Sequence, residues 1–365
     1  MDPRVLDAMM PFFTQYFGNA ASRTHKFGWE AESAVEYARE QVAYLINAEP
    51  KEIVFTSGAT EADNLALKGI LELYKSKGNR IITVKTEHKA VLDSCKHLEK
   101  IGADVTYLNV KNDGFIDVEE LENAINTQTI LISVMYANNE TGVIQPIKEI
   151  AAIAKKKGVL FFSDATQAVG KIPVDVIKDG IDLMSFSAHK MYGPKGIGAL
   201  YVRRKNPRVR ISAQMDGGGH ERGMRSGTLN VPAIVGFGKA CELAHIEMKK
   251  DAEKISKLRN KLEAELSKTG NAFINGNTEY RLPNVSNMSF QNVNSVDLIS
   301  ALNKNIALSS GSACTSGTNE PSYVLKAMGL SDEMARSSLR FGLGRFTTEE
   351  EIDYTIGQVI TLLPQ

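Results

Sequence analysis

The sequence predicts an α/β protein with two domains. Strand candidates that are almost continuously apolar alternate with helical segments over residues 50–203, which is typical of a mainly parallel sheet covered by helices on both faces. The chain has 365 residues, more than the roughly 250 to 300 at which one core usually stops growing. A helical region at 232–268 becomes heavily charged in its second half, as expected of a linking helix. We therefore predict a large domain at 1–250 and a small α+β domain at 251–365, with which the first residues could also pack.

The composition is that of an ordinary soluble protein. Lys and Arg (43) balance Asp and Glu (43), so no overall field attracts nucleic acid or an anionic membrane. No apolar run approaches the roughly 18 residues of a membrane span, and the N-terminus lacks an apolar signal segment. The three cysteines are too scattered for a disulfide framework. We expect a cytoplasmic protein that binds neither membrane nor, directly, nucleic acid.

The N-terminal 48 residues are predicted to be mostly helical. A polar loop at 17–28 separates a first helix from a second one at 32–46. The first helix would place its apolar residues on one face: Val5, Leu6, Met9 and Met10.

A strand at 53–57, Gly58 and a helix from Ala59 form the next unit. The unpaired amides and dipole of a helix N-terminus make such a turn a ready anion site, and phosphate would fit. The alternative is that Ser57 or Thr60 only caps the helix.

Further strands are predicted at 80–85, 103–108, 129–135 and 159–162, with helices between them, among them one from Val118 and one at 147–157. Because the carboxyl ends of parallel strands meet at one edge, one crevice could collect the polar residues that follow them. These residues are His88, Asn139, Asp164, Gln167, Ser187, His189 and Lys190.

Lys190 follows the apolar strand of the stretch 181–196 and precedes a glycine-proline turn. An amine desolvated there would favour its neutral form, which condenses with aldehydes to a Schiff base; the alternative is an exposed lysine in a turn. Asp164 directly follows two phenylalanines. Its carboxylate needs a cationic partner, such as a protonated ring nitrogen, unless it caps a helix or joins a structural ion pair.

The rest of the chain continues through a strand at 198–203, a basic surface patch at 203–210 and a glycine-rich stretch at 217–228. The small domain is predicted to hold strands at 285–290, 306–309 and 337–341 and helices at 295–302, near Tyr323 and from Thr348.

Cys314 lies among small and polar residues at 309–320. Cys95 and Cys241 have helical, partly apolar surroundings, so Cys314 differs from both. A thiol displayed on a loop invites oxidation unless it is used, and we predict a reactive role for it.

Four stretches, 56–61, 164–167, 187–190 and 309–315, together resemble the cysteine desulfurases of the NifS/IscS type. These are pyridoxal-phosphate enzymes of aminotransferase class V, and the resemblance extends over 2–357. It implies fold type I of the PLP-dependent transferases, with a mainly parallel seven-stranded sheet in the large domain and a smaller α+β C-terminal domain.

The resemblance also implies how pyridoxal 5'-phosphate is held. Lys190 would carry it as a Schiff base, Asp164 would pair with the ring nitrogen, and His88 would stack on the ring. The remaining implied contacts are Gln167 for the ring hydroxyl, Asn139 beside the substrate, and Ala59, Thr60, Ser187, His189 and, from the other subunit of a homodimer, Thr228 for the phosphate.

The implied reaction removes sulfur from L-cysteine and leaves L-alanine and a persulfide on Cys314. Arg340 would grip the substrate carboxylate, Lys190 would act as general base, and His88 would exchange a proton with the substrate thiol. The long Cys314 loop resembles the branch that serves iron–sulfur assembly or tRNA thiolation. We expect an iron–sulfur scaffold protein or another sulfur acceptor as partner, with Cys314 as a transient cluster ligand, although one cysteine is no metal site by itself.

The sequence departs from the family pattern at both of its ends. Relatives usually carry a strand before the Asp-Pro-Arg that opens this sequence and a scaffold-docking tail after its end, so we expect these differences to affect substrate entry and scaffold binding.

Three other functions are disfavoured by particular residues. A selenocysteine or cysteine lyase on the same fold is disfavoured by Cys314, because selenium can leave without a thiol nucleophile. An inactive sulfur-transfer partner or scaffold is disfavoured by Lys190, Asp164, His88 and Cys314. A nucleotide-binding dehydrogenase is disfavoured because no strand is followed by G-x-G-x-x-G.

Overall fold

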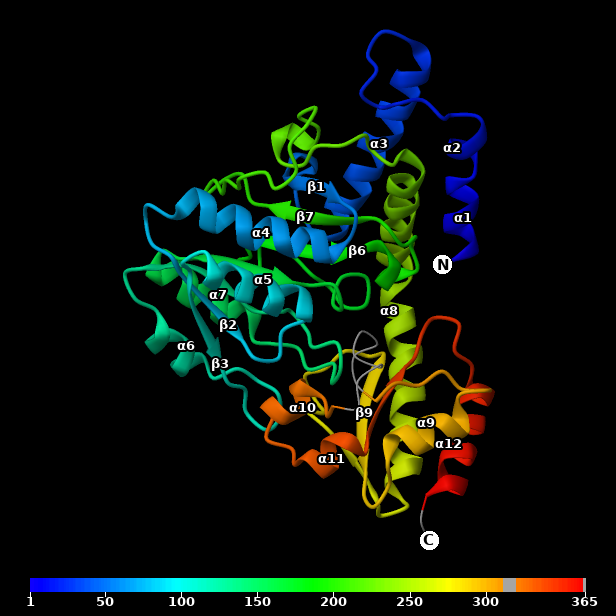
Figure 1. Ribbon diagram of the computed structural model, residues 1–365. Helices are drawn as coiled ribbons and strands as arrows, with labels where there is room; N and C mark the ends of the chain where they lie inside the picture. The colour runs from blue at the N-terminus through cyan, green and yellow to red at the C-terminus, as the bar shows by residue number, and fades with distance from the viewer. Residues whose placement is uncertain (311–319, 364–365) are drawn as a thin grey trace.

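The computed structural model describes residues 1–310 and 320–363. A large sheet and a small sheet lie side by side along one long helix, α8 (Val231–Ser267), which runs past both of them (Figure 1).

The large sheet has seven strands in the order β1-β7-β6-β5-β4-β2-β3. All of its strands run parallel except β7, which is antiparallel to its neighbours β1 and β6. This confirms the predicted mainly parallel seven-stranded sheet. The strands are β1 (Ile53–Thr56), β2 (Arg80–Val84), β3 (Asp104–Leu108), β4 (Thr129–Ser133), β5 (Leu160–Asp164), β6 (Leu183–Ser187) and β7 (Gly198–Val202).

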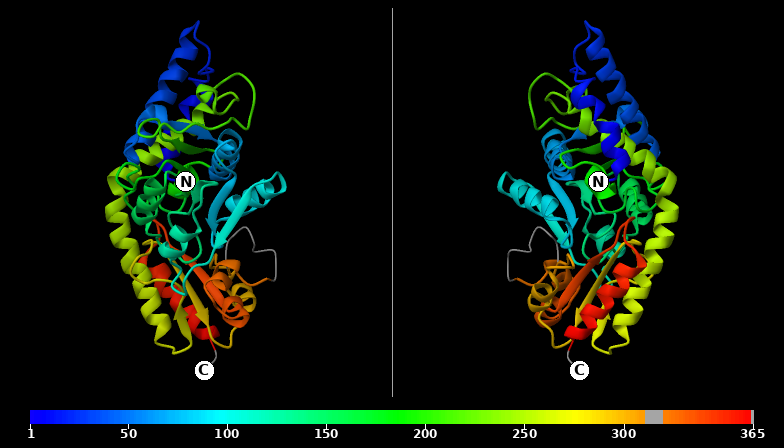
Figure 2. Two further views of the ribbon diagram at one scale, coloured as in Figure 1. Left: turned by 90° about the vertical axis from the view of Figure 1, so that its left-hand side faces the viewer. Right: turned by 90° about the vertical axis from the view of Figure 1, so that its right-hand side faces the viewer.

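Helices cover both faces of this sheet, because successive strand residues point to opposite sides. Phe161 packs into one hydrophobic cluster with α3, α7 and the first half of α8, and Phe162 packs into another with α4 and α5. Figure 2 shows the two helical layers from the side. The helices of this part are α1 (Pro3–Met9), α2 (Pro11–Thr14), α3 (Lys26–Leu45), α4 (Ala59–Tyr74), α5 (Lys89–Lys100), α6 (Val118–Ala124) and α7 (Ile147–Lys157), with short 3-10 turns η1 (Pro50–Glu52), η2 (Ala188–Met191) and η3 (Glu221–Gly223).

The small sheet is antiparallel, in the order β10-β9-β8. A third hydrophobic cluster joins it to the second half of α8 and to two further helices. The elements are β8 (Ala272–Ile274), β9 (Val285–Phe290), β10 (Ser338–Gly342), α9 (Ser295–Leu302), α10 (Tyr323–Ala327), α11 (Asp332–Arg336) and α12 (Glu349–Leu362).

Along α8 the hydrophobic contacts change partner between Leu243, in the large core, and Ile255, in the small one. The predicted boundary at residue 250 falls in this interval and stays a prediction. The N-terminus reaches the second half of the chain, since Arg345 donates to Asp2 Oδ2 at 2.9 Å and to Asp251 at 2.7 Å.

Three details of the predicted elements are wrong. Leu6 and Met10 are 42% and 48% exposed, because α1 meets α8 through Met9, whose sulfur lies against Gly236. The second helix begins at Lys26 instead of residue 32, since His25 caps it by accepting the Gly28 N–H at 3.2 Å. Residues 306–309 belong to no strand; Ser309 forms only an isolated bridge with Arg340.

Candidate active site

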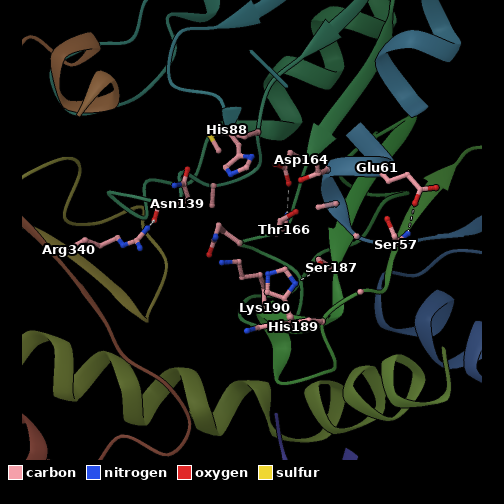
Figure 3. Close-up of a pocket in the computed structure, with 18 residues that line it drawn as sticks. Ser57, Glu61, His88, Asn139, Asp164, Thr166, Ser187, His189, Lys190 and Arg340 are labelled. Atoms are coloured by element: carbon pink, nitrogen blue, oxygen red, sulfur yellow. Dashed lines mark hydrogen bonds between the residues drawn. The ribbon is translucent and has the colours of Figure 1, made fainter. Parts of the chain in front are cut away.

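A cavity of about 430 Å³ lies at the carboxyl ends of the parallel strands. It is bordered by the turn after β1, by Asp164 at the end of β5 and by Ser187 at the end of β6 (Figure 3). The structure thus brings together every predicted site residue except Thr228 and Cys314. Those that line the cavity are Ala59, Thr60, His88, Asn139, Asp164, Gln167, Ser187, His189, Lys190 and Arg340.

Lys190 lies on η2, directly after β6. The Gly193 N–H closes this turn on Ala188 O at 2.9 Å, and a Cβ on Gly193 would come within 2.8 Å of the Ala188 Cβ. The turn therefore requires glycine and directs Lys190 at the cavity. The Lys190 side chain is exposed, so the position alone does not desolvate the amine, contrary to our expectation; an occupant of the cavity would have to do so.

Asp164 is buried, and its Oδ1 accepts the Thr166 N–H at 2.9 Å. No helix begins at Asp164, so the alternative that it caps a helix is wrong. Two fully buried carboxyls lie nearby, Asp63 on α4 and Glu87 after β2. Burial and, secondly, the Asp164 charge raise the pKa of both well above the usual value.

One end of the cavity suits an anion. The N-cap of α4 is Gly58, which has no side-chain hydrogen bond to the helix, so the predicted alternative of simple capping by Ser57 or Thr60 is wrong. Ser187 Oγ lies 2.7 Å from His189 Nδ1. Burial and the neighbouring lysines, first Lys190, lower the pKa of His189, so its ring is neutral at pH 7 and can donate a hydrogen bond.

At the other end lie Asn139 and Arg340 (Figure 3). Arg340, on β10, donates from Nη1 to Asn139 O at 3.1 Å, so the small sheet contributes to the site. His88 lies between the two ends as N-cap of α5; its Nδ1 accepts the Ala90 N–H at 3.2 Å. A neutral His88 ring therefore carries its proton on Nε2.

Two predicted residues are not placed in the cavity. Thr228 is exposed and is not among the lining residues, and Cys314 lies outside the described part of the chain. Lining residues that sequence reasoning did not assign are Glu61, Met135, Ala137, Thr166 and Lys195. Thr166 and Glu61 lie inside two of the stretches that carry the family resemblance, 164–167 and 56–61. Their place in these stretches is the signal from which they could have been predicted as site residues.

Glu61 has an ion-pair partner from the glycine-rich stretch. Arg225 donates to it at 2.7 Å, and the Ser57 N–H donates to its other oxygen at 2.7 Å. Burial would raise the pKa of Glu61, but these hydrogen bonds lower it overall. Glu61 is therefore an anion that orders the turn after β1.

The expected cofactor fits these residues on their own chemistry. Asn139 Oδ1 and Thr166 Oγ1 are buried polar atoms with no partner within the described chain, as expected where a ligand supplies the hydrogen bonds. An open helix N-terminus matches a phosphate, and a buried carboxylate matches a protonated ring.

Residues 1–310 and 320–363 contain no group of three or more His, Cys, Asp or Glu that could hold a metal ion. None of the described helices is long and apolar enough to cross a bilayer.

The sequence matches the model of the family "Aminotransferase class-V" over residues 1–355. The chain is 59% identical over 357 residues to the "Cysteine desulfurase IscS" of Anaeromyxobacter sp. (strain K), covering 98% of this chain and 88% of that protein. It is 58% identical over 358 residues to the protein of the same name from Escherichia coli O139:H28, again over 98% and 88%.

Solved structures are similar over the whole fold. A "NifS-like protein" superposes with a TM-score of 0.93 at 40% identity, covering 99% of this chain and 96% of that one. A structure described as "SspA in complex with cysteine" has a TM-score of 0.82 at 37% identity, covering 95% and 97%.

Proposed function

This chain belongs to the class-V aminotransferase family, and from that premise we propose that it is a cysteine desulfurase acting on free L-cysteine. The observation that carries the proposal is the convergence of Lys190, Asp164 and Arg340 on one cavity, in a chain 59% identical to an IscS relative. A lysine amine, a buried carboxylate and an arginine fork are the groups that an amino acid and an aldehyde cofactor need.

The cofactor of the proposal is pyridoxal 5'-phosphate, on which this family depends. Lys190 would hold it covalently, Asp164 would keep its ring nitrogen protonated, and the N-terminus of α4 with Ser187 and His189 would bind its phosphate. When bound, it supplies an aldehyde that binds amines and a ring that takes up an electron pair. His88 and Gln167 would fix the orientation of the ring.

The protein's own groups then handle the substrate. Arg340 binds the carboxylate of L-cysteine, the amino acid that the SspA structure holds according to its description. The Lys190 amine would accept the Cα proton, and His88 Nε2 would exchange a proton with the substrate thiol.

Cys314 is the proposed nucleophile. Its thiolate would attack the substrate sulfur, so that a sulfur–sulfur bond forms, the carbon–sulfur bond breaks, and the carbon skeleton is protonated and leaves as L-alanine. The persulfide would pass its sulfur to an acceptor in iron–sulfur assembly or tRNA thiolation. The proposal includes a cytoplasmic location, in keeping with the free thiols at Cys95 and Cys241.

The active form of the proposal is a homodimer. Thr228 is exposed, on the glycine-rich stretch that also holds Arg225, which is compatible with contact to a neighbour's phosphate site. Exposed aromatic side chains on the N-terminal segments, Phe13, Phe17, Phe27 and Trp29, offer apolar surface to a second subunit.

The test is to supply the purified, cofactor-loaded chain with L-cysteine and a reductant and to measure alanine and sulfide. We expect stoichiometric products, and a loss of at least about 100-fold in the Cys314→Ala variant, which should still bind cofactor. Cys95→Ala is the matched control, because Cys95 is fully buried and burial raises the pKa of its thiol to about 12. Sulfide release by Cys314→Ala at the parental rate would refute the role of Cys314, and lack of any alanine from the parent would refute the function.

A further inference from the structure

A second lysine, Lys171, lies behind the wall of the cavity. Its Nζ donates to Gln167 Oε1 at 3.3 Å. Gln167 lines the cavity and Lys171 does not, so Lys171 acts on the site through Gln167. With Oε1 engaged, the Gln167 amide presents its NH2 group as the free donor.

The backbone holds these two residues in a fixed relation. Residues 165–172 form consecutive turns in which the Lys171 N–H donates to Ala168 O at 3.0 Å. Gly170 has a φ of +78°, and a Cβ there would come within 2.8 Å of the Met191 Cβ on η2. The turn that carries Lys171 therefore packs directly against the turn that carries Lys190.

The charges on these two turns are coupled. Burial and, secondly, the charge of Lys190 lower the pKa of Lys171 to about 7. Lys171 in turn contributes, with Lys190 and Lys195, to the lowered pKa of His189. The charged neighbours of Lys171 are thus Lys190 and His189, both on η2. Two ammonium groups so placed oppose each other's protonation.

We propose that Lys171 is a positioning residue of this site, which turns the Gln167 amide donor toward the cofactor and opposes excess positive charge at Lys190. The proposal rests on the proposed function for the identity of the cofactor. When Lys190 holds the cofactor covalently, its nitrogen would be a cation only in the protonated form of the bound cofactor, and Lys171 would oppose that protonation.

The first test uses the full chain without cofactor, so that it does not depend on the proposed function. Each lysine is labelled by reductive methylation across a pH series, and the extent is read by peptide mass spectrometry. We expect Lys171 to label with a midpoint near the pKa of about 7, and this midpoint to rise by at least about half a pH unit in Lys190→Met, because a repelling charge is gone. An unchanged Lys171 midpoint in Lys190→Met would overturn the coupling.

The second test uses cofactor-loaded protein and reads the pH at which the absorption of the bound cofactor changes. The protonated form carries one more positive charge, so Lys171→Met should raise this midpoint by at least about half a unit. Lys171→Arg, which keeps charge and donor, should stay near the parent. Lys178→Met is the control, because Lys178 is 76% exposed and pairs with Asp175 away from Gln167. Equal midpoints in Lys171→Met and the parent would refute the proposal.

A third measurement isolates the positioning role. In the parent, Lys171→Met should raise the dissociation constant of the cofactor several-fold. In a Gln167→Ala background the same substitution should hardly change this constant, because the lysine acts through the Gln167 amide. The same loss in both backgrounds would show that Lys171 does not work through Gln167. A parent that binds no cofactor would instead count against the proposed function and leave the labelling result to decide the coupling.

Discussion

The Arg340 guanidinium holds the edge of the cavity where the two sheets meet. Its Nη1 donates to Asn139 O at 3.1 Å, and its planar fork can bind a carboxylate with two parallel hydrogen bonds, which a lysine cannot reproduce. We predict that Arg340→Lys raises the KM for L-cysteine by about 10- to 100-fold with a smaller change in kcat, because the carboxylate is gripped in the ground state as well.

Steady-state alanine formation at varied L-cysteine measures this. Arg336→Lys, an exposed arginine four residues earlier, is the control and should keep the parental KM. A parental KM in Arg340→Lys would assign the substrate carboxylate to another group.

Single site residues could be predicted from the sequence where they follow a strand. Asp164 and Lys190 stand at or just beyond the ends of β5 and β6, and motif resemblance supplied their expected roles. The residues behind them could not be predicted. Asp63 accepts a hydrogen bond from the Ser185 hydroxyl, 122 positions further along the chain. Lys171 lies near Lys190 only because the turns that carry them pack against each other.

At the scale of elements, the strands of the large sheet were predicted more closely than its helices, since the second helix begins six residues before its predicted start. The helix at 147–157 and the strand at 285–290 have the predicted bounds, because their apolar spacing and flanking residues agree. The short β8 and α11 were missed: three and five residues carry too little periodicity. The strand predicted at 306–309 fails because the Ile306 N–H donates back to Leu302 O at 2.9 Å and, among the described residues of this segment, only Ser309 forms a β-bridge, with Arg340 on β10.

A buried ion pair fixes helix α3 to the sheet edge and to η3. Arg39 donates to both carboxylate oxygens of Glu221 at 2.8 Å, and Glu221 also accepts the Phe55 N–H of β1 at 2.8 Å. The two side chains are 3% and 1% exposed. We predict that Arg39→Met lowers the free energy of unfolding by about 3–5 kcal/mol, because it leaves the Glu221 charge buried without its partner.

Urea unfolding followed by circular dichroism measures this loss. Lys26→Met, which removes the exposed partner of Glu30 on the same helix, is the control and should cost no more than about 0.5 kcal/mol. The double variant Arg39→Met/Glu221→Met should recover part of the loss, since no unpaired charge remains. Similar small costs for Arg39→Met and Lys26→Met would mean that the pair does not hold α3 in place.

For the whole molecule, the two sheets are joined by the continuous helix α8 and by contacts of the chain's first residues. Arg345, after β10, binds Asp2 and Asp251 together, and Arg340 reaches the cavity from the small sheet. The site therefore depends on the relative position of both halves. Sequence reasoning predicted the halves, but which residues join them depends on packing between distant segments.

The pH dependence of the global stability should report the buried carboxyls below the cavity. Burial, and then the Asp164 charge, raise the pKa of Asp63 well above its usual value. The folded chain therefore holds the Asp63 proton to a higher pH than the unfolded chain does, so folding takes up a proton between the two pKa values. Its contribution to stability is fully present below the unfolded pKa, about 3.9, and is lost as pH rises toward the folded pKa.

We predict that Asp63→Asn removes this loss. The asparagine oxygen can still accept the Ser185 hydroxyl, and its NH2 group replaces an Asp63 oxygen that has no partner in the described chain. Relative to the parent, the free energy of unfolding of the variant should therefore increase by up to about 1.4 kcal/mol for each pH unit above 4. Urea titrations of the cofactor-free protein at pH 5, 6, 7 and 8 measure the difference. For Asp7→Asn, at an exposed position on α1, the free energy of unfolding should change with pH as it does in the parent. The same pH dependence for Asp63→Asn would mean that Asp63 is ionised in the folded protein.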